Sequence, residues 1–282
     1  MRRAALLVLA LLGLAGAARA DCAAPAGPCR IASGDYHVAL PATERRPIPA
    51  VVFLHGAGGD GSGVIGNRPL VASLTARGYA VLAPTGSRLF RDGPGRSWSF
   101  YPGWEGRDET KFLAAVVADA ATRFAIDPDA VLLAGFSAGG FMVTYLACEA
   151  PESFAAYAPV SGGFWRPHPA GCAGPVRLLH THGWSDTTVP LEGRFLGGGR
   201  FQQGDIFAGL EIWRAANRCP DQRPDAYAET GPFWRRSWTG CAPGSALELA
   251  LFAGGHTVPE GWADLALDWF EALPPRRVTR RP

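Results

Sequence analysis

Short apolar runs that alternate with amphipathic stretches are the feature that most limits the fold of this chain. We expect strands at 50–54, 79–83, 130–134, 155–160, 176–181 and 247–252, an edge strand at 36–40, and helices at 69–77, 108–124, 137–150, 207–217 and 262–273. The strand runs are apolar without alternation, so both of their faces must be buried, which is typical of a parallel sheet covered by helices. The sequence therefore predicts the α/β class, with a mostly parallel central sheet and helices on both faces.

The first twenty residues have the pattern of a secretory signal peptide. Arg2-Arg3 precedes an unbroken apolar run at 4–17, and Ala18-Arg19-Ala20 fits a small-residue cleavage site. The apolar run is shorter than the ~20 residues that a membrane-spanning helix needs. We therefore expect a cleaved leader at 1–20, a single domain at 21–275 that is periplasmic or secreted, and a basic, disordered tail at 276–282.

The net charge of the mature chain excludes some classes of partner. Cleavage after Ala20 removes Arg2, Arg3 and Arg19, which leaves 24 of the 27 basic residues against 25 acidic ones. A chain so close to neutral has no strongly basic surface, so we expect neither nucleic acid nor a membrane as a partner. The sequence leaves the oligomeric state open.

All six cysteines follow the expected leader, and no C-x-x-C motif is present. An even number of cysteines in an exported chain indicates disulfide bonds. Six cysteines allow 15 pairings, among which the sequence alone does not choose. The simplest set joins near neighbours, as Cys22–Cys29, Cys148–Cys172 and Cys219–Cys241.

A G-x-S-x-G motif, Gly135-Phe136-Ser137-Ala138-Gly139, lies between an expected strand and an expected helix. In this context the serine sits on a tight turn above the sheet, and the small glycines give it room. The N-terminus of the following helix would favour negative charge that develops beside the serine. The motif therefore predicts Ser137 as a nucleophile, against the alternative of a glycine-rich turn without a role.

A nucleophilic serine needs a histidine base and an acid that orients this base, in the chain order Ser, Asp or Glu, His. His256 follows the last expected strand, and Asp186 lies in the loop after the preceding one. We therefore expect Ser137, Asp186 and His256 to form a catalytic triad. Glu192 and Asp205 are weaker candidates for the acid. A metal site built on His180, His182 and Asp186 lacks an obvious fourth ligand, so we expect no metal.

The loop after the first buried strand, His55-Gly56-Ala57-Gly58-Gly59, is the expected source of one oxyanion donor. The Ala57 N–H is our choice, with Gly58 as the alternative, and the Ala138 N–H is the expected second donor. The same loop matches G-x-G-x-x-G. A dinucleotide site would also need an acid at the end of the next strand, which here ends Ala83-Pro84-Thr85. We therefore expect no nicotinamide or other cofactor.

The motifs together resemble those of the secreted α/β-hydrolase esterases that include polyhydroxybutyrate depolymerases and feruloyl and acetylxylan esterases. The resembling segments cover roughly residues 45–275 and include Phe53-Leu54-His55-Gly56, Gly135–Gly139, Ala158–Gly162, His182-Gly183-x-x-Asp186-x-x-Val189-Pro190 and Gly254-Gly255-His256. The resemblance implies the α/β-hydrolase fold, the Ser137–Asp186–His256 triad, and disulfides near Cys148–Cys172 and Cys219–Cys241. The chain departs from the family pattern after the histidine, where Thr257 stands, and after His55-Gly56, where Ala57 stands in place of a frequent cysteine.

Aromatic side chains near the expected triad are candidates for substrate contact. Trp98 and Trp104 lie in a loop before the expected helix at 108–124, and Trp184 is two residues from Asp186. Flat apolar side chains beside a polar triad suit an aromatic or short acyl group, although such residues also serve as packing aromatics.

The sequence therefore predicts a secreted serine esterase that forms an acyl-enzyme on Ser137. Its expected substrates are small esters or oligoesters, such as polyhydroxyalkanoate oligomers and feruloyl, acetyl or similar short-acyl esters. Two alternatives stay open: an exported serine peptidase of the same fold, and a catalytically silent binding protein on the hydrolase scaffold.

Overall fold

A computed structural model of the chain describes residues 22–23, 27–90, 93–276 and 278. The expected leader at 1–20 lies outside the described residues, as does most of the expected tail. In the described part of the tail, Arg276 contacts Glu152 and the Val278 N–H donates to Asp129.

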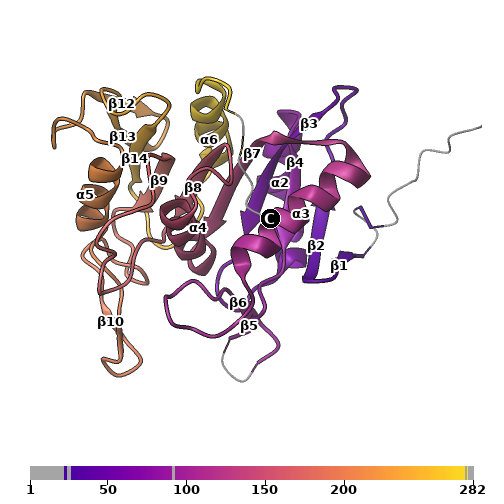
Figure 1. Ribbon diagram of the computed structural model, residues 1–282, viewed down its shortest axis with the longest axis horizontal. Helices are drawn as coiled ribbons and strands as arrows, with labels where there is room; N and C mark the ends of the chain where they lie inside the picture. Colours follow the sequence, from indigo (N-terminus) through magenta and orange to yellow (C-terminus); the bar gives the residue numbers. More distant parts are fainter. Residues whose placement is uncertain (1–21, 24–26, 91–92, 277, 279–282) are drawn as a thin grey trace, which may run out of the picture.

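A ten-stranded sheet forms the centre of the described structure (Figure 1). Its order is β1-β2-β4-β3-β7-β8-β9-β14-β13-β12, with parallel pairing from β4 to β14 and antiparallel pairing at both edges. The strands are β1 (Cys29–Ile31), β2 (Gly34–Ala39), β3 (Ile48–Leu54), β4 (Ala80–Pro84), β7 (Ile126–Phe136), β8 (Ala156–Val160), β9 (Arg177–Gly183), β12 (Ala226–Thr230), β13 (Phe233–Trp238) and β14 (Ala246–Phe252). The prediction of a mostly parallel central sheet is confirmed.

Helices cover both faces of the sheet, also as predicted (Figure 1). Helices α3 (Glu109–Phe124), α4 (Ala138–Glu149) and α5 (Ile206–Ala216) pack into one apolar core. Helices α1 (Gly61–Gly66), α2 (Arg68–Ala76) and α6 (Trp262–Glu271) pack into the other. Strands β3, β4, β8 and β9 are buried along their whole length, because they lie between these two layers.

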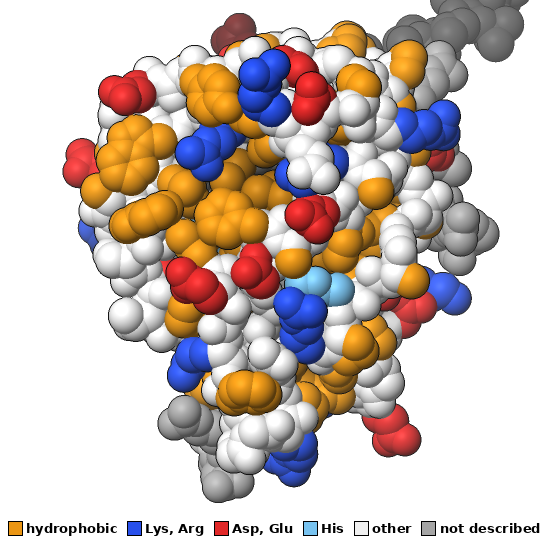
Figure 2. Space-filling view, turned by 90° about the vertical axis from the view of Figure 1, so that its left-hand side faces the viewer, with side chains coloured by type: hydrophobic (Ala, Val, Ile, Leu, Met, Phe, Trp, Pro, Cys, Tyr) orange, Lys and Arg blue, Asp and Glu red, His pale blue; other side chains and the backbone are white. Residues whose placement is uncertain are grey.

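Strands β12 and β13 form an edge hairpin that the apolar pattern does not reveal. All five residues of β12 are exposed, and β13 carries Arg235 and Arg236 in its middle. A hairpin at the edge of a sheet needs little buried apolar surface, so the signal used for the other strands is weak here. Seen from this end of the sheet, hydrophobic side chains gather in one area of the surface among scattered charged ones (Figure 2).

Two short hairpins project from the carboxyl edge of the parallel strands, and the sequence analysis did not predict them. They are β5 (Arg88–Leu89) with β6 (Arg96–Ser97), and β10 (Phe195–Leu196) with β11 (Phe201–Gln202). Both lie at the lower edge of the sheet in Figure 1. No helix in the described part of the chain is long and apolar enough to cross a membrane.

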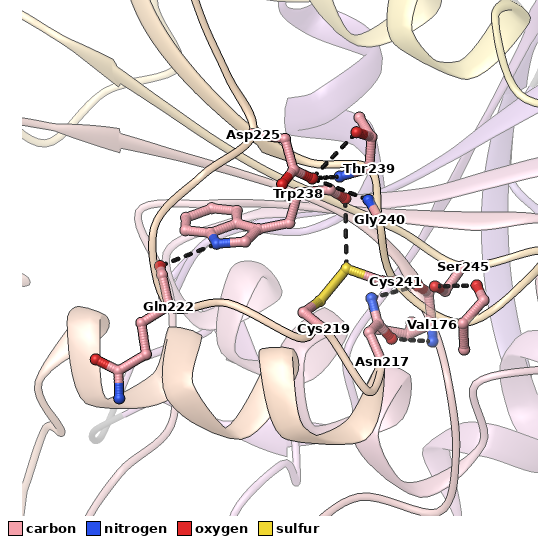
Figure 3. The surroundings of a disulfide bond; sticks show 11 residues. Val176, Asn217, Cys219, Gln222, Asp225, Trp238, Thr239, Gly240, Cys241 and Ser245 are labelled. Atoms are coloured by element: carbon pink, nitrogen blue, oxygen red, sulfur yellow. Dashed lines mark hydrogen bonds between the residues drawn. A yellow bond between two sulfur atoms is a disulfide. The ribbon is translucent and has the colours of Figure 1, made fainter.

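All six cysteines are paired in the near-neighbour set, as Cys22–Cys29, Cys148–Cys172 and Cys219–Cys241. The second pair fastens the end of helix α4 to the segment before β9. The third ties the chain just after α5 to the loop between β13 and β14 (Figure 3).

Asn217 joins helix α5 to the start of β9 beside this third disulfide (Figure 3). Its side chain is fully buried, accepts from the Val176 N–H at 2.7 Å and donates to the Val176 carbonyl at 3.0 Å. Its own carbonyl accepts from the Ala242 N–H. One amide side chain thus satisfies two backbone groups at the entry to a central strand, where water has no access.

We expect Asn217→Ala to lower the free energy of unfolding by about 2–3 kcal/mol, because it leaves the buried Val176 N–H without a partner. It also removes one of two donors to the Val176 carbonyl, which still accepts from the Ala246 N–H. Urea unfolding with intact disulfides measures this value. Asn67→Ala is the matched control, because Asn67 is an exposed cap of α2 and its removal should cost about 1 kcal/mol. Equal losses in the two variants would contradict the structural role of Asn217.

Candidate active site

Three side chains from distant parts of the chain form one hydrogen-bonded row at the carboxyl edge of the sheet. Ser137 Oγ lies 2.9 Å from His256 Nε2, and His256 Nδ1 lies 2.7 Å from Asp186 Oδ2. A carboxylate only accepts hydrogen bonds, so His256 Nδ1 carries the proton and Nε2 is free to accept from the serine hydroxyl. The structure therefore brings together the three residues that the sequence analysis selected.

Ser137 occupies a sharp turn between β7 and α4. Its backbone has φ 56° and ψ −116°, a conformation that non-glycine residues rarely adopt and that stores strain. Gly139 permits the turn to pack closely, because a Cβ at this position would lie 2.2 Å from the Leu54 carbonyl oxygen. The turn lifts the serine hydroxyl out of the sheet and places it at the N-terminus of α4.

Asp186 lies in the turn after β9, and its side chain is fully buried. Its Oδ1 accepts from the Thr188 and Val189 N–H groups at 2.9 and 2.8 Å. Burial would raise the pKa of Asp186, but the hydrogen bonds from Val189 and His256 outweigh it, so this pKa lies below its ordinary value. The carboxyl group therefore stays charged beside His256.

Two further histidines, to which the sequence analysis gave no role, support the turn that carries Asp186. His182 Nε2 donates to the Val189 carbonyl at 2.8 Å and lies 3.7 Å from Asp186 Oδ2. His182 Nδ1 lies 3.0 Å from Nε2 of His180, so it accepts from the neighbouring ring. Both rings are buried in β9. The sequence shows that the two histidines alternate along the strand. It does not show that His182 contacts the Val189 carbonyl.

This arrangement uses His182 as a brace rather than as a metal ligand. In the described residues, no group of three His, Cys, Asp or Glu side chains could hold a metal ion. The pKa values of His180 and His182 are lowered, chiefly by burial. Both rings are thus neutral, as the hydrogen-bond pattern requires.

The loop that carries His256 packs directly on the turn after β9. A Cβ on Gly183 would lie 2.3 Å from the Gly255 carbonyl oxygen, so only glycine permits this approach. The Ser185 N–H donates to the Gly254 carbonyl at 2.9 Å, and the His256 ring stacks obliquely on Phe136. The acid and the histidine are therefore held by contact between their own backbones.

The loop after β3 and the first turn of α4 carry the N–H groups that we expected as oxyanion donors. The Gly58 N–H donates to the Arg96 carbonyl at 2.8 Å, so this group is already engaged. In the described residues, neither the Ala57 N–H nor the Ala138 N–H donates to a backbone carbonyl. Of the two choices for the first donor, the geometry therefore favours Ala57 over Gly58.

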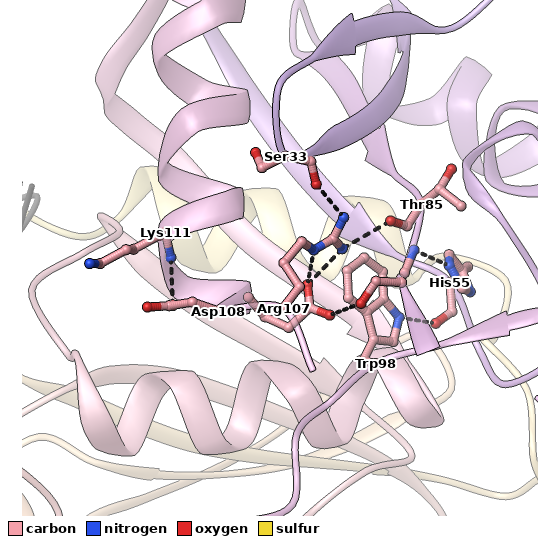
Figure 4. Close-up of polar contacts among 10 residues, drawn as sticks. Ser33, His55, Thr85, Trp98, Arg107, Asp108 and Lys111 are labelled. Carbon is pink, nitrogen blue, oxygen red and sulfur yellow. Dashed lines mark hydrogen bonds and ion pairs between the residues drawn. The ribbon is translucent and has the colours of Figure 1, made fainter. Parts of the chain in front are cut away.

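His55 holds this loop in place (Figure 4). Its Nδ1 donates to the Gly56 carbonyl at 2.8 Å, and its Nε2 accepts from the Gly86 N–H at 2.9 Å. Trp98 Nε1 donates to the His55 carbonyl at 2.9 Å. Trp98 has no exposed surface, so it does not offer its ring to a substrate as expected and instead supports the loop.

The next strand end is anchored by Arg107, which also appears in Figure 4. Arg107 donates to the Thr85 and Ser33 carbonyls and forms a paired contact with Glu109. Burial raises the pKa of Glu109, an effect that the charge of Arg107 opposes. The contacts of Arg107 with Ser33 and Thr85 cannot be predicted from the sequence spacing, because these segments meet only when the sheet has formed.

The other two expected substrate residues lie at the surface of this edge. Trp184 is 60% exposed beside the turn of Asp186. Trp104 is partly exposed and belongs to a group that we call the aromatic cluster, whose rings contact one another at centroid distances of 5.0–5.9 Å: Phe100, Tyr101, Trp104, Phe141, Trp165 and Phe201. The Trp184 side chain is thus mostly open to solvent, whereas Trp104 is only partly so.

The buried histidine pair should make the protein sensitive to mild acid. Below about pH 6.5 the unfolded chain binds protons on these histidines, whereas in the folded chain burial lowers the pKa of both rings and opposes their protonation. We expect the free energy of unfolding to fall as the pH drops from 6.5 to 5, by at most about 1.4 kcal/mol per pH unit for each histidine, with His180 the larger contributor. Urea unfolding at several pH values in this range measures the free energy of unfolding of the wild type and of His180→Gln. This free energy should change less with pH in the variant. Equal slopes would show that His180 is not held neutral.

Comparisons with known proteins point to one family. The family model described as Esterase PHB depolymerase matches residues 35–177, about half of the chain. A relative named "Probable feruloyl esterase C" from Aspergillus terreus is 31% identical over 159 residues, which are 55% of this chain and 53% of the relative. The "Bifunctional acetylxylan esterase/xylanase XynS20E" of Neocallimastix patriciarum is 27% identical over 195 residues, which are 68% of this chain and 25% of the relative. The chain thus spans about half or less of these relatives' lengths.

Solved structures share the fold. The acetyl xylan esterase from Aspergillus awamori superposes with a TM-score of 0.61 at 18% identity, over 84% of this chain and 93% of that one. A Bacillus cereus carboxylesterase gives a TM-score of 0.55 at 15% identity, over the same shares. These likenesses identify the α/β-hydrolase fold. The family match over residues 35–177 shows that the chain belongs to the esterase PHB depolymerase family.

Proposed function

We propose that this protein is a carboxylic ester hydrolase that works through an acyl-enzyme on Ser137. The observation that carries the proposal is the hydrogen-bonded row of Ser137, His256 and Asp186, with the serine on a strained turn at a helix N-terminus. The same constellation recurs on unrelated folds, where it performs acyl transfer. The names of the relatives, which include feruloyl and acetylxylan esterases, support ester substrates.

Each residue has a distinct part in the proposed reaction. Ser137 Oγ attacks the ester carbonyl while His256 Nε2 takes the hydroxyl proton, and the charge of Asp186 stabilises the imidazolium that forms. The Ala57 and Ala138 N–H groups bind the oxyanion. His256 then gives its proton to the leaving alcohol. A water molecule, activated by His256, releases the acid and restores the serine.

The candidate substrates are short-acyl esters, such as polyhydroxyalkanoate oligomers and feruloyl or acetyl esters. The aromatic cluster and the exposed Trp184 support a substrate with an apolar or flat group. We also propose that the protein is exported, because three disulfides persist only in an oxidising compartment and the sequence begins with a leader pattern.

Replacing the nucleophile tests the mechanism directly. We expect Ser137→Ala to lower kcat for 4-nitrophenyl butyrate by about 10⁴–10⁶-fold, because the variant cannot form the acyl-enzyme. A fluorophosphonate probe should label the wild type on Ser137 and leave the variant unlabelled. Thr144→Val is a control, since Thr144 lies on the same helix and donates only to the Gly140 carbonyl. Full activity in Ser137→Ala would refute the assignment.

A matched pair of substrates separates an esterase from a peptidase. We expect the wild type to hydrolyse 4-nitrophenyl butyrate at least about 10³-fold faster than the corresponding butyranilide, because amide cleavage has the higher barrier and the leaving amine must be protonated. A panel of hydroxybutyrate oligomers, methyl ferulate and acetylated xylan then ranks the acyl groups. Comparable rates on ester and anilide would favour the peptidase. No reaction with either substrate or with the probe would favour a silent binding protein.

A further inference from the structure

The aromatic cluster begins one helical turn from the nucleophile. The Phe141 N–H donates to the Ser137 carbonyl at 2.8 Å, in the first turn of α4. The Phe141 ring lies 5.2 Å from Phe100 and 5.7 Å from Trp165, centroid to centroid. Phe100 and Trp165 are buried, whereas Trp104 and Phe201 are partly exposed. The cluster therefore runs from the helix that carries Ser137 out to the surface.

Two arginines stack on the outer rings of the cluster. Arg88, on strand β5, places its guanidinium carbon 4.1 Å from the centroid of the Trp104 ring. Arg200, in the turn between β10 and β11, places its own 5.3 Å from the centroid of Phe201. Trp104 and Phe201 are in edge-to-face contact at 5.8 Å, so the two cations lie over neighbouring rings.

Neither of these guanidinium groups has a carboxylate partner within 4 Å in the described part of the chain. Other arginines at this edge are engaged, because Arg107 pairs with Glu109 and Arg194 donates to the Thr188 carbonyl. A guanidinium that lies over a ring can keep its in-plane N–H donors free for another partner. These donors match the geometry of a carboxylate, which they can bind with two parallel hydrogen bonds.

The hairpin of Arg88 is also fixed to the candidate oxyanion loop. Strand β6 pairs with β5, and its Arg96 carbonyl accepts from the Gly58 N–H while the Arg96 N–H donates to the Gly59 carbonyl. A Cβ on Gly95 would lie 2.5 Å from the Gly58 carbonyl oxygen, so the two segments are in close contact. The hairpin that carries Arg88 is therefore held next to the loop that would bind the oxyanion.

We propose that Arg88, assisted by Arg200, binds a carboxylate on the substrate, so that the enzyme prefers esters with an apolar or aromatic group that carries a negative charge. The inference rests on the proposed ester hydrolysis at Ser137 and adds the charge of the substrate to it. The carboxylate would lie against the two guanidiniums while the apolar part covers Trp104 and Phe201. Arg88 acts as a specificity residue and takes no part in the proton transfers.

The kinetic test uses two pairs of esters, and the two members of each pair differ by one negative charge. Phenyl butyrate and 4-carboxyphenyl butyrate carry the charge on the alcohol side, and methyl hexanoate and monomethyl adipate carry it on the acyl side. We expect Arg88→Gln to lower the ratio of kcat/KM for the charged over the neutral ester by about fivefold to twentyfold in at least one pair. Differences in leaving-group reactivity cancel, because each ester is compared between two enzymes. Arg88→Lys should keep part of the preference.

Arg214→Gln is the matched control. Arg214 also stacks on a tryptophan, with its guanidinium carbon 5.6 Å from the Trp238 ring, but it lies on α5 and pairs with Glu211. We expect this variant to keep the wild-type ratio. A ratio that stays within twofold of the wild type in Arg88→Gln and in the double variant Arg88→Gln/Arg200→Gln, for both ester pairs, would overturn the proposal.

A binding test separates this inference from the proposed reaction. In the Ser137→Ala background, NMR titration should show benzoate binding about fivefold to twentyfold more tightly than its neutral isostere benzamide. Adding Arg88→Gln should remove the preference. Equal affinities for benzoate and benzamide in Ser137→Ala would overturn the charge preference. Failure of the wild type to hydrolyse any ester would overturn the proposed function alone, since the titration needs no turnover.

Discussion

The rest of the site depends on the hydrogen bonds that the buried carboxylate of Asp186 accepts. A charged group without exposed surface is tolerated only where donors surround it, and here Thr188, Val189 and His256 supply them. Two of these donors come from the turn that carries the acid, and the third comes from a loop on another strand. The same hydrogen bonds that offset the burial therefore fix the ring of His256, and this ring in turn fixes the proton acceptor for Ser137.

The residues that support the site are also buried polar groups, and each has a specific hydrogen-bond partner. His182 braces the acid turn through the Val189 carbonyl, and His180 braces His182. On the other side, His55 and Trp98 hold the loop after β3. None of these four side chains need touch a substrate. Their common effect is to leave the proposed reacting groups with one arrangement, so little reorganisation is needed during the reaction.

Much of the fold could be predicted, because the central strands are apolar on both faces and end at turn residues. The G-x-S-x-G motif, with a strand before and a helix after it, was enough to select Ser137. Asp186 and His256 were selected by chain order together with their positions just after expected strands. The prediction failed where burial is slight or partners are remote. Strand β12 is exposed throughout, so it lacks an apolar signal. Trp98 was expected at the substrate, but its partner His55 lies 43 positions away and draws it into the interior.

The position of strand β14 makes the site a product of the whole chain. This strand pairs in parallel with β9 and antiparallel with β13, and the loop that follows it carries His256. Ser137 and His256 are 119 residues apart, so an N-terminal portion that ends before residue 256 lacks the histidine. A ribosome has to synthesise nearly the entire polypeptide before the histidine can reach the serine. In the proposed mechanism, a chain that ends before residue 256 cannot hydrolyse esters, so hydrolysis reports that the last parallel strand has docked.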